Sequence, residues 1–465
     1  MAIKSVLANL GFLLQISGIL ILLPIVLAFY FNETVACISL LTTGMNMLSL
    51  GFILNSLAKK QRLDLKSSCA LVTIVFYLIS IIGSIPYIYE GIFSESNFFS
   101  NFTDSFFESV SGFTTTGFSL VLNPAALPKS IQFYRALTEL MGGVGLIFIL
   151  LAFFYPSRDL IKVSDVLGIE KTTKDLRKTY FSVLIIYLAY IGIFTAAFYF
   201  LGFRDVLDTL NSVIHLITTG YNPLNFERYL IYPNNLLVLA LILISSINFS
   251  VHYNLFRLKF KKILDKEDYF YIILIIVGVL VFMILSNAGI LDSIFHVVSM
   301  TSSAGYHYIP FDRMSGVLIL FLISLMFIGG TRYSMAGGIK VFRFFVILKS
   351  IIIKIKLKLG MRLSDEEKRL THVIIMKNLL SVFLSVLLVF FCVIILILRG
   401  LPYINSLFEV TSAFSTTGET LGFVNQSLAL DLKWLLIFLM IIGRIEVIPF
   451  LVTLFPEKIK VEKLV

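Results

Sequence analysis

The stretch "GFTTTGFS" at Gly112–Ser119 sets three threonines and a glycine between segments apolar enough to cross a bilayer. The pattern recurs: a polar residue, a mostly apolar run, small hydroxyl residues and then a glycine. Repetition at matching positions argues against an ordinary turn or a helix-packing site of small residues, which would explain a single copy. The copies are "DSFFESVSGFTTTG" (Asp104–Gly117), "LDTLNSVIHLITTG" (Leu207–Gly220), "DSIFHVVSMTSSAG" (Asp292–Gly305) and "NSLFEVTSAFSTTG" (Asn405–Gly418).

The composition is that of a polytopic membrane protein. The 465 residues are 58% hydrophobic and 14% charged, whereas an ordinary soluble domain has about 25% charged residues. Apolar runs of about 20 residues are long enough to cross about 30 Å of hydrocarbon as helices. They predict ten spans: Leu10–Phe31, Val35–Leu57, Cys69–Tyr89, Leu137–Tyr155, Tyr180–Leu201, Ile231–Leu255, Tyr269–Leu285, Val317–Ser350, Val373–Leu398 and Leu432–Leu454.

The positive charges give these spans an orientation. Lys and Arg number 38 against 28 Asp and Glu, and they cluster in short segments between spans, which favours membrane orientation over nucleic-acid binding. The positive-inside rule then predicts cytoplasmic clusters, both termini inside and all copies of the repeated motif on the outer side. The clusters are Lys59–Lys66, Arg158–Lys178, Arg257–Lys266, Lys340–Arg369 and Lys458–Lys463.

Each copy of the motif is expected to begin a short helix. Asp104, Asp292 and Asn405 lie thirteen residues before their glycines and are predicted N-caps, while the second copy has Asp208 shifted by one. Some ten helical residues cover about 15 Å. The chain is therefore expected to enter the bilayer as this short helix and to return to the outer side as the hydroxyl-rich segment. Each repeat is then a span, a pore helix, a filter segment and a second span. The predicted domains are a two-helix extension at 1–66 and pore repeats at 67–178, 179–267, 268–370 and 371–465.

Four such units around one axis would make a cation pore. Inward-facing carbonyls can replace a hydration shell, glycine permits the required backbone, and the pore helices point their negative carboxyl ends at the centre. Oxygen ligands without a ring of carboxylates suit a monovalent cation better than Ca²⁺ or Mg²⁺. The predicted ion-binding residues are Thr115, Thr116, Gly117, Thr218, Thr219, Gly220, Ser303, Ala304, Gly305, Thr416, Thr417 and Gly418.

Three further stretches make a resemblance specific. With the four filters, the chain resembles the membrane subunit of Trk/Ktr-type potassium uptake systems, the TrkH/KtrB superfamily, and its two extra helices resemble the TrkH branch. The stretches are "RALTELMGGVGLIFI" (Arg135–Ile149), "GGTRYSMAGGIKVFR" (Gly329–Arg343) and "GRIEVIPFLVTLFP" (Gly443–Pro456).

The resemblance implies a fold and a function. It implies an all-α membrane protein with a four-fold pseudosymmetric pore, acting as a homodimer in the bacterial inner membrane and transporting K⁺. It also implies a cytoplasmic nucleotide-binding regulator of the TrkA/KtrA type, so that nucleotide acts only through this partner; no covalent cofactor is expected. Four filter glycines imply preference for K⁺ over Na⁺, although the third filter departs from the threonine-rich form at Ser302, Ser303 and Ala304.

The span after the third filter is interrupted by glycines and polar residues. Non-helical backbone at membrane depth persists only where it is buried in protein or faces water. The resemblance identifies 329–340 as an intramembrane gating loop. Arg332 is hypothesised to add positive charge to the closed gate, the alternative being an arginine that reaches the cytoplasmic surface. The predicted gating residues in the loop are Gly329, Gly330, Thr331, Arg332, Tyr333, Gly337, Gly338 and Lys340.

Arg444 lies about twelve residues into the last predicted span. A charge at that depth is costly and indicates function, and the resemblance places an arginine below the filter. We therefore expect Arg444 to act as an electrostatic barrier or gate contact. The alternative is a structural ion pair with Glu139 or Glu446.

The position nine residues before each glycine is polar, and these side chains are predicted to anchor the pore helices: Glu108, Asn211, His296 and Glu409. Other classes of protein fit less well. A secondary transporter with inverted repeats would alternate the orientation of its repeats, and no HExxH, GxSxG or Walker pattern indicates an enzyme. A cation-coupled transporter and a less selective K⁺/Na⁺ pathway remain as alternatives.

Overall fold

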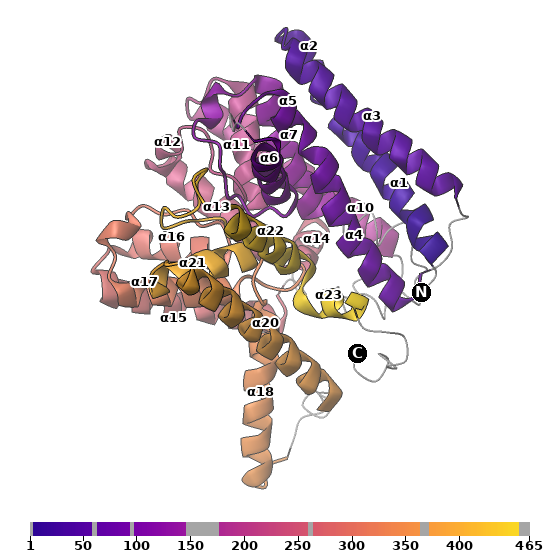
Figure 1. Cartoon of the computed structure of the whole chain (residues 1–465). Coiled ribbons are helices and arrows are strands. Elements are labelled where there is room, and N and C mark those ends of the chain that lie inside the picture. The colour runs from indigo at the N-terminus through magenta and orange to yellow at the C-terminus, as the bar shows by residue number, and fades with distance from the viewer. Residues whose placement is uncertain are drawn as a thin grey trace.

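The structure is a computed structural model that describes residues 3–57, 63–93, 97–145, 176–258, 264–362 and 372–454. Within these ranges every regular element is a helix (Figure 1). Six of the described helices are long and apolar enough to cross a membrane, or up to eight if each of two bent pairs forms one span. The predicted all-α, multi-pass architecture is therefore confirmed, whereas the predicted total of ten spans stays a prediction.

The first two spans form a hairpin at the edge of the molecule (Figure 1). Helices α1 (Ile3–Ile21) and α2 (Ile25–Tyr30) lead into α3 (Thr34–Ser56), which packs along α1. Glycines allow the close approach: a β-carbon added at Gly11 would lie 2.5 Å from the carbonyl oxygen of Gly51.

Four similar groups of helices follow. Each has a long apolar helix, a short buried helix, an extended segment and a second helix. The groups are α4 (Leu65–Gly83), α5 (Ile85–Tyr89), α6 (Phe98–Phe113), α7 (Lys129–Leu140) and the π-helical turn η2 (Met141–Gly145); α10 (Leu176–Phe200), α11 (Val206–Thr218), α12 (Glu227–Leu230), α13 (Asn234–Ser246) and α14 (Phe249–Phe256); α15 (Lys266–Ser286), α16 (Ile290–Thr301), α17 (Gly316–Ile328) and α18 (Val341–Lys358); and α20 (His372–Leu398), α21 (Tyr403–Phe414), α22 (Leu430–Ile445) and α23 (Val447–Leu454).

The second helix is interrupted in the second, third and fourth groups, although the sequence predicted this only for the third. The pair α13 and α14 bends by 108° and the pair α22 and α23 by 103°. The second bend occurs at Glu446, whose φ is 74°. In the first group, α7 passes into the η2 turn, and the rest of the predicted span Leu137–Tyr155 lies outside the described residues. The bends within the predicted spans Ile231–Leu255 and Leu432–Leu454 were therefore not predicted, and each bent pair is either one broken span or a re-entrant segment.

The predicted N-caps of the short helices were also wrong. Helix α6 begins earlier, with Asn97 in an extended conformation accepting the amide of Phe99, so that Asp104 lies inside the helix. The cap of α11 is Asp205, which accepts the amide of Asp208. Helices α16 and α21 begin after Gly289 and Pro402, respectively. Counting back from the glycines located the helices but not their first residues, because an Asp or Asn inside a helix can give the same sequence signal as a cap.

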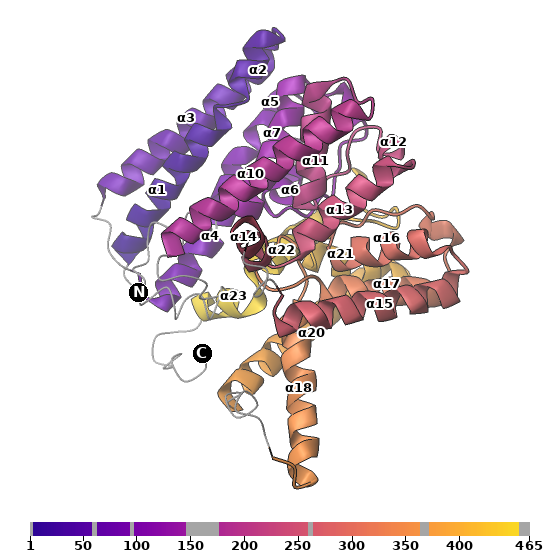
Figure 2. The ribbon, with the colours of Figure 1, turned by 180° about the vertical axis from the view of Figure 1, so that it is seen from behind.

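The short helices form the interior of the molecule. Every residue of α6 from Thr103 to Phe113 is buried, as is every residue of α11 from Asn211 to Thr218. The long helices instead expose much of their apolar surface; only 22% of the apolar window of α15 is buried. This arrangement places the carboxyl ends of four short helices near the centre. From behind, α18 is seen to project away from the body of the molecule (Figure 2).

Candidate ion pathway

Each short helix ends in the same backbone turn. Just after the helix, one residue has a left-handed backbone conformation. The amide of the residue after it donates to the carbonyl five residues earlier in the chain. In the first segment Thr115 has φ 54° and the Thr116 amide donates to Ser111 at 2.9 Å. Equivalent bonds run from Ala304 to Ser299 and from Thr417 to Ser412, both 2.9 Å. The left-handed residues are Thr115, Thr219, Ser303 and Thr416.

The four segments meet in a closed ring. A β-carbon added at Gly418 would lie 1.8 Å from the Thr116 carbonyl oxygen, and one added at Gly117 would lie 2.3 Å from that of Gly220. The third and fourth segments meet where Gly305 faces the carbonyl of Thr417. The Tyr306 hydroxyl donates to the carbonyl of His215 at 3.2 Å and closes the ring between the second and third segments. Side chains at Gly117 and Gly418 would collide with neighbouring main chain, and one at Gly305 would be tightly packed.

The second segment is out of register with the others. Gly117, Gly305 and Gly418 each follow the left-handed residue by two positions and have φ of 86°, 76° and 70°. Helix α11 runs one residue further, through Thr218, so the left-handed residue is Thr219 and the Gly220 amide makes the five-residue bond to His215 at 3.2 Å. Gly220 was predicted at the position of the other three glycines. Tyr221 occupies that place instead.

Buried hydroxyl groups accompany the main-chain ring. The Oγ1 atoms of Thr115 and Thr416 are buried, and neither finds a hydrogen-bond partner in the described part of the chain. Next to them, Thr114 and Thr116 hydroxyls are 2.7 Å apart, and the hydroxyls of Ser415 and Thr417 repeat this pair at the same distance. The third segment has no such pair because Ala304 lacks the hydroxyl. Buried unsatisfied oxygens of this kind indicate a place for a water or a cation.

Three of the predicted anchors fasten their segments. Glu108 accepts the amide of Leu120 at 2.9 Å, His296 accepts that of Tyr308 at 3.1 Å and Glu409 accepts that of Leu421 at 2.8 Å. Each bond joins a short helix to the segment that follows its glycine, so the predicted anchoring is confirmed for these three. Asn211 makes no such bond.

The predicted gating loop lies between α17 and α18 and folds tightly on itself. Main-chain bonds join Ile339 to Phe327 and Val341 to Gly330, both at 3.0 Å. Gly329 has φ 74°, and a β-carbon there would lie 2.1 Å from the Gly337 carbonyl oxygen. The glycines are thus required by close backbone contact.

The loop lies directly against the filter segments. The Gly337 amide donates to the Ser303 hydroxyl at 3.0 Å, and a β-carbon on Gly337 would lie 1.9 Å from the carbonyl oxygen of Ser415. The outer side of the loop is fastened to the break between α13 and α14, where Thr331 and Met335 amides donate to Ser246 and Ser245 at 3.1 and 2.9 Å.

The two basic residues of the loop, Arg332 and Lys340, both have partners within the described structure. Arg332 donates to Glu267 of α15 through Nε at 2.9 Å and its own amide at 2.6 Å, and its guanidinium lies over Phe342. Its charge is therefore compensated, and it fastens the loop to α15. Lys340, at the end of the loop, donates to the carbonyl of Ala336.

Arg444 bridges the loop and the first repeat. It donates to the carbonyls of Met335 at 3.1 Å and of Gly142 and Gly143 at 3.0 Å each. The ion pairs considered from the sequence are made elsewhere: Glu139 contacts His215, and Glu446 pairs with Arg343. The sequence did not reveal Glu139, Glu267 or Ser245 as partners of the filter and loop. In the sequence, the only feature that marks these three residues is that each is polar and lies within or beside an apolar run.

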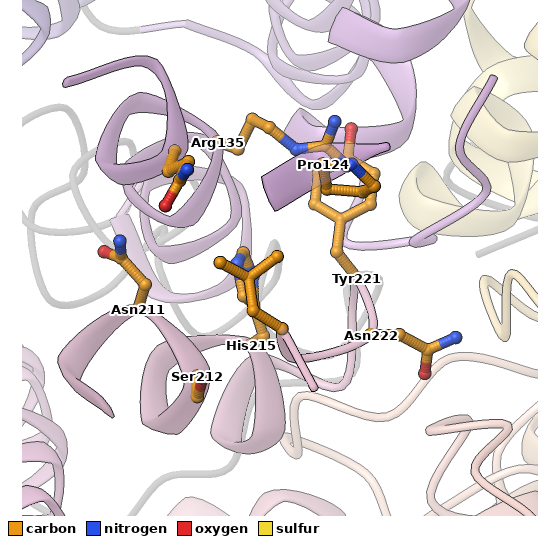
Figure 3. A pocket seen from close by; sticks show the side chains of 9 residues that line it. Pro124, Arg135, Asn211, Ser212, His215, Tyr221 and Asn222 are labelled. Carbon is orange, nitrogen blue, oxygen red and sulfur yellow. The ribbon is translucent and has the colours of Figure 1, made fainter. Parts of the chain in front are cut away.

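A small pocket lies beside the second filter segment (Figure 3). Its volume of about 20 Å³ is room for about one water, and it is lined by Asn211, Ser212 and His215 of α11 together with Tyr221 and Arg135. Such a cavity is too small for an organic solute. Among the described residues no group of three His, Cys, Asp or Glu side chains could hold a metal ion.

Comparison with known proteins agrees with this geometry. The sequence model of the TrkH family, described as a cation transport protein, matches residues 38–273 and 266–462. The chain belongs to the TrkH family. It is 29% identical to the "Uncharacterized cation transporter MJ1485" of Methanocaldococcus jannaschii, covering 97% of this chain and 95% of that protein.

Other relatives of this TrkH-family chain match along nearly its whole length. It is 24% identical to the "Trk system potassium uptake protein TrkH" of Halomonas elongata, over 98% of this chain and 99% of that one. The crystal structure of the potassium transporter TrkH from Vibrio parahaemolyticus has the same fold, with a TM-score of 0.83, 23% identity and coverage of 98% and 99%. The family and the apolar helices make this chain a multi-pass membrane transporter and not an enzyme.

The contact between loop and filter predicts a measurable effect of Gly337→Ala. The added carbon would displace the loop from Ser415, an overpacking cost of about 1–3 kcal/mol, so the rate of deuterium uptake over 329–340 should rise about five- to 150-fold. Gly192→Ala is the matched control, because nothing lies within 4 Å of its added carbon. Unchanged protection of 329–340 in Gly337→Ala would contradict the described contact.

Proposed function

We propose that this chain conducts K⁺ selectively across the membrane through the ring formed by its four filter segments. The observation that carries the proposal is the closed ring of main chain, in which Gly117 and Gly418 leave no room for side chains and Gly305 leaves little. Carbonyl oxygens held this closely can replace the hydration shell of a monovalent cation. The relatives named as potassium uptake proteins support K⁺ as the ion.

The hydroxyl layer would extend the ion site inward. Thr115 and Thr416 present buried oxygens without protein partners in the described structure, and Thr219 and Ser303 occupy the same position in the other segments. Neutral oxygens without a ring of carboxylates favour K⁺ over divalent ions. The third quarter contributes carbonyls but lacks the hydroxyl at Ala304.

The loop 329–340 would be the gate. It contacts the inner side of the third and fourth segments through Gly337, and Arg444 holds it to Gly142 and Gly143. Hydrogen bonds from a charged donor contribute about 1.5–3 kcal/mol each. Arg444 thus stabilises the closed loop and places a positive charge in the path of a cation.

Helix α18 would connect the gate to a regulator. It starts at Val341, directly after the loop, and projects from the body with basic residues in its last turn (Figure 2). We infer that a cytoplasmic nucleotide-binding partner of the TrkA/KtrA type moves this helix and thereby the loop. A homodimer in the cytoplasmic membrane with both termini inside completes the proposal, on the basis of the family resemblance and the positive clusters.

Flux in lipid vesicles tests the selectivity. Purified chain should carry K⁺ and Rb⁺ faster than Na⁺, and Gly117→Ser should lower the ratio of K⁺ to Na⁺ flux at least about tenfold, because its β-carbon would displace the Gly220 carbonyl. Gly192→Ser serves as the control. Equal K⁺ and Na⁺ flux in the unmodified chain would refute a selective pathway, and uptake of an organic solute would favour a secondary transporter.

A second experiment tests the gate. Arg444→Gln removes the charge and most of the bonds that join Met335 of the loop to Gly142 and Gly143 of the first repeat, so K⁺ flux without a regulator should rise several-fold. Arg399→Gln is a suitable control because Arg399 pairs with Asp431 at the surface, with its side chain 57% exposed. If folded Arg444→Gln protein has unchanged or lower basal flux, Arg444 has no role in closure.

A further inference from the structure

The second filter segment lacks the anchor that the other three have. In those, the anchor on the pore helix accepts an amide twelve residues further along the chain. Twelve residues after Asn211 is Pro223, which has no amide hydrogen to donate. Both polar side-chain atoms of Asn211 are buried, and neither has a partner among the described residues.

Glu139 of α7 takes over this function from the neighbouring repeat. Its Oε1 accepts the Tyr221 amide at 2.6 Å, and its Oε2 accepts the Thr218 hydroxyl at 2.8 Å and lies 2.8 Å from His215 Nδ1. The carboxylate is fully buried. It therefore fixes the residues on both sides of Gly220.

The same carboxylate explains Gly220. A β-carbon there would lie 2.2 Å from Glu139 Oε1. Gly220 does not have the left-handed φ of the other three filter glycines. Gly220 is therefore needed to leave space for the Glu139 carboxylate, whereas the other three glycines are needed for their left-handed backbone.

Tyr221 can then occupy a position where the other segments have glycine. Its ring lies under the Arg135 guanidinium at 4.0 Å, and its hydroxyl donates to the Glu108 carbonyl at 2.6 Å. Figure 3 shows Arg135 reaching over Tyr221. The tyrosine side chain is thus held against the first repeat while Glu139 holds its amide.

We propose that Glu139 is the positioning residue that sets the shape of the second filter quarter and thereby the discrimination between K⁺ and Na⁺. The inference rests on the proposed K⁺ pathway. The ring makes the effect specific, since the Gly220 carbonyl lies against Gly117 of the first quarter. A shift of Gly220 would alter the spacing of carbonyls in two quarters at once.

Glu139→Gln tests the proposal with almost no change in volume. The amide has one acceptor oxygen, so it cannot accept from Tyr221 on one side and Thr218 on the other. In vesicles the K⁺ to Na⁺ flux ratio should fall at least about tenfold, with Na⁺ flux rising. Glu33→Gln is the matched control, because Glu33 accepts the Lys129 and Ser130 amides at the start of the same helix at 2.6 and 3.0 Å.

A second variant covers the case in which Glu139→Gln does not fold. Thr218→Val removes one hydroxyl contact to the carboxylate and should also lower the flux ratio, by a smaller factor. An unchanged ratio in folded Thr218→Val and in any folded Glu139→Gln would overturn the proposal. A fall of equal size in Glu33→Gln would also overturn it, since α7 would then act only as a support. If the unmodified chain does not prefer K⁺, the proposed function itself fails, which is a distinguishable result.

Discussion

The structure depends on direct contact between main-chain atoms at the centre of a membrane protein. Backbone that leaves a helix at this depth must find its hydrogen bonds within the protein. The four filter turns do so by bonding back to their own helices, and the interrupted second helices close around them. Gly142 and Gly443 show how tight this is: β-carbons there would lie 1.7 and 2.0 Å from the carbonyl oxygens of Phe113 and Phe414.

This constraint links the filter to the loop below it. Gly337 approaches Ser415 as closely as Gly443 approaches Phe414, so the same kind of contact holds the helices and the loop. The loop and the helix differ in how they are attached to the rest of the protein. The loop is attached by a few hydrogen bonds to Ser245, Ser246, Glu267 and Arg444, whereas the α22 glycine belongs to a packed helix. A segment with few fastenings can open at low cost, which suits a gate.

The sequence predicted the all-α architecture, the four short helices and the break in the second span of the third repeat, because hydropathy and a repeated motif are local signals. It did not predict the bends at Ile247 and Glu446 or the start of α6, since such breaks depend on packing against the filter. The register of the second filter was also missed. "TTG" reads alike in the sequence at Thr218–Gly220 and Thr115–Gly117, and the different register becomes visible in the structure, where Glu139 contacts Thr218 and Tyr221.

The central claim is that one monovalent cation site lies where the four segments meet. Crystals of the protein grown in Rb⁺ would test it through anomalous scattering. The account predicts a peak on the axis between the main-chain oxygens of the filter and the hydroxyls of Thr115 and Thr416, which is lost when Na⁺ replaces Rb⁺. A peak elsewhere in the protein, with the ring empty, would contradict it.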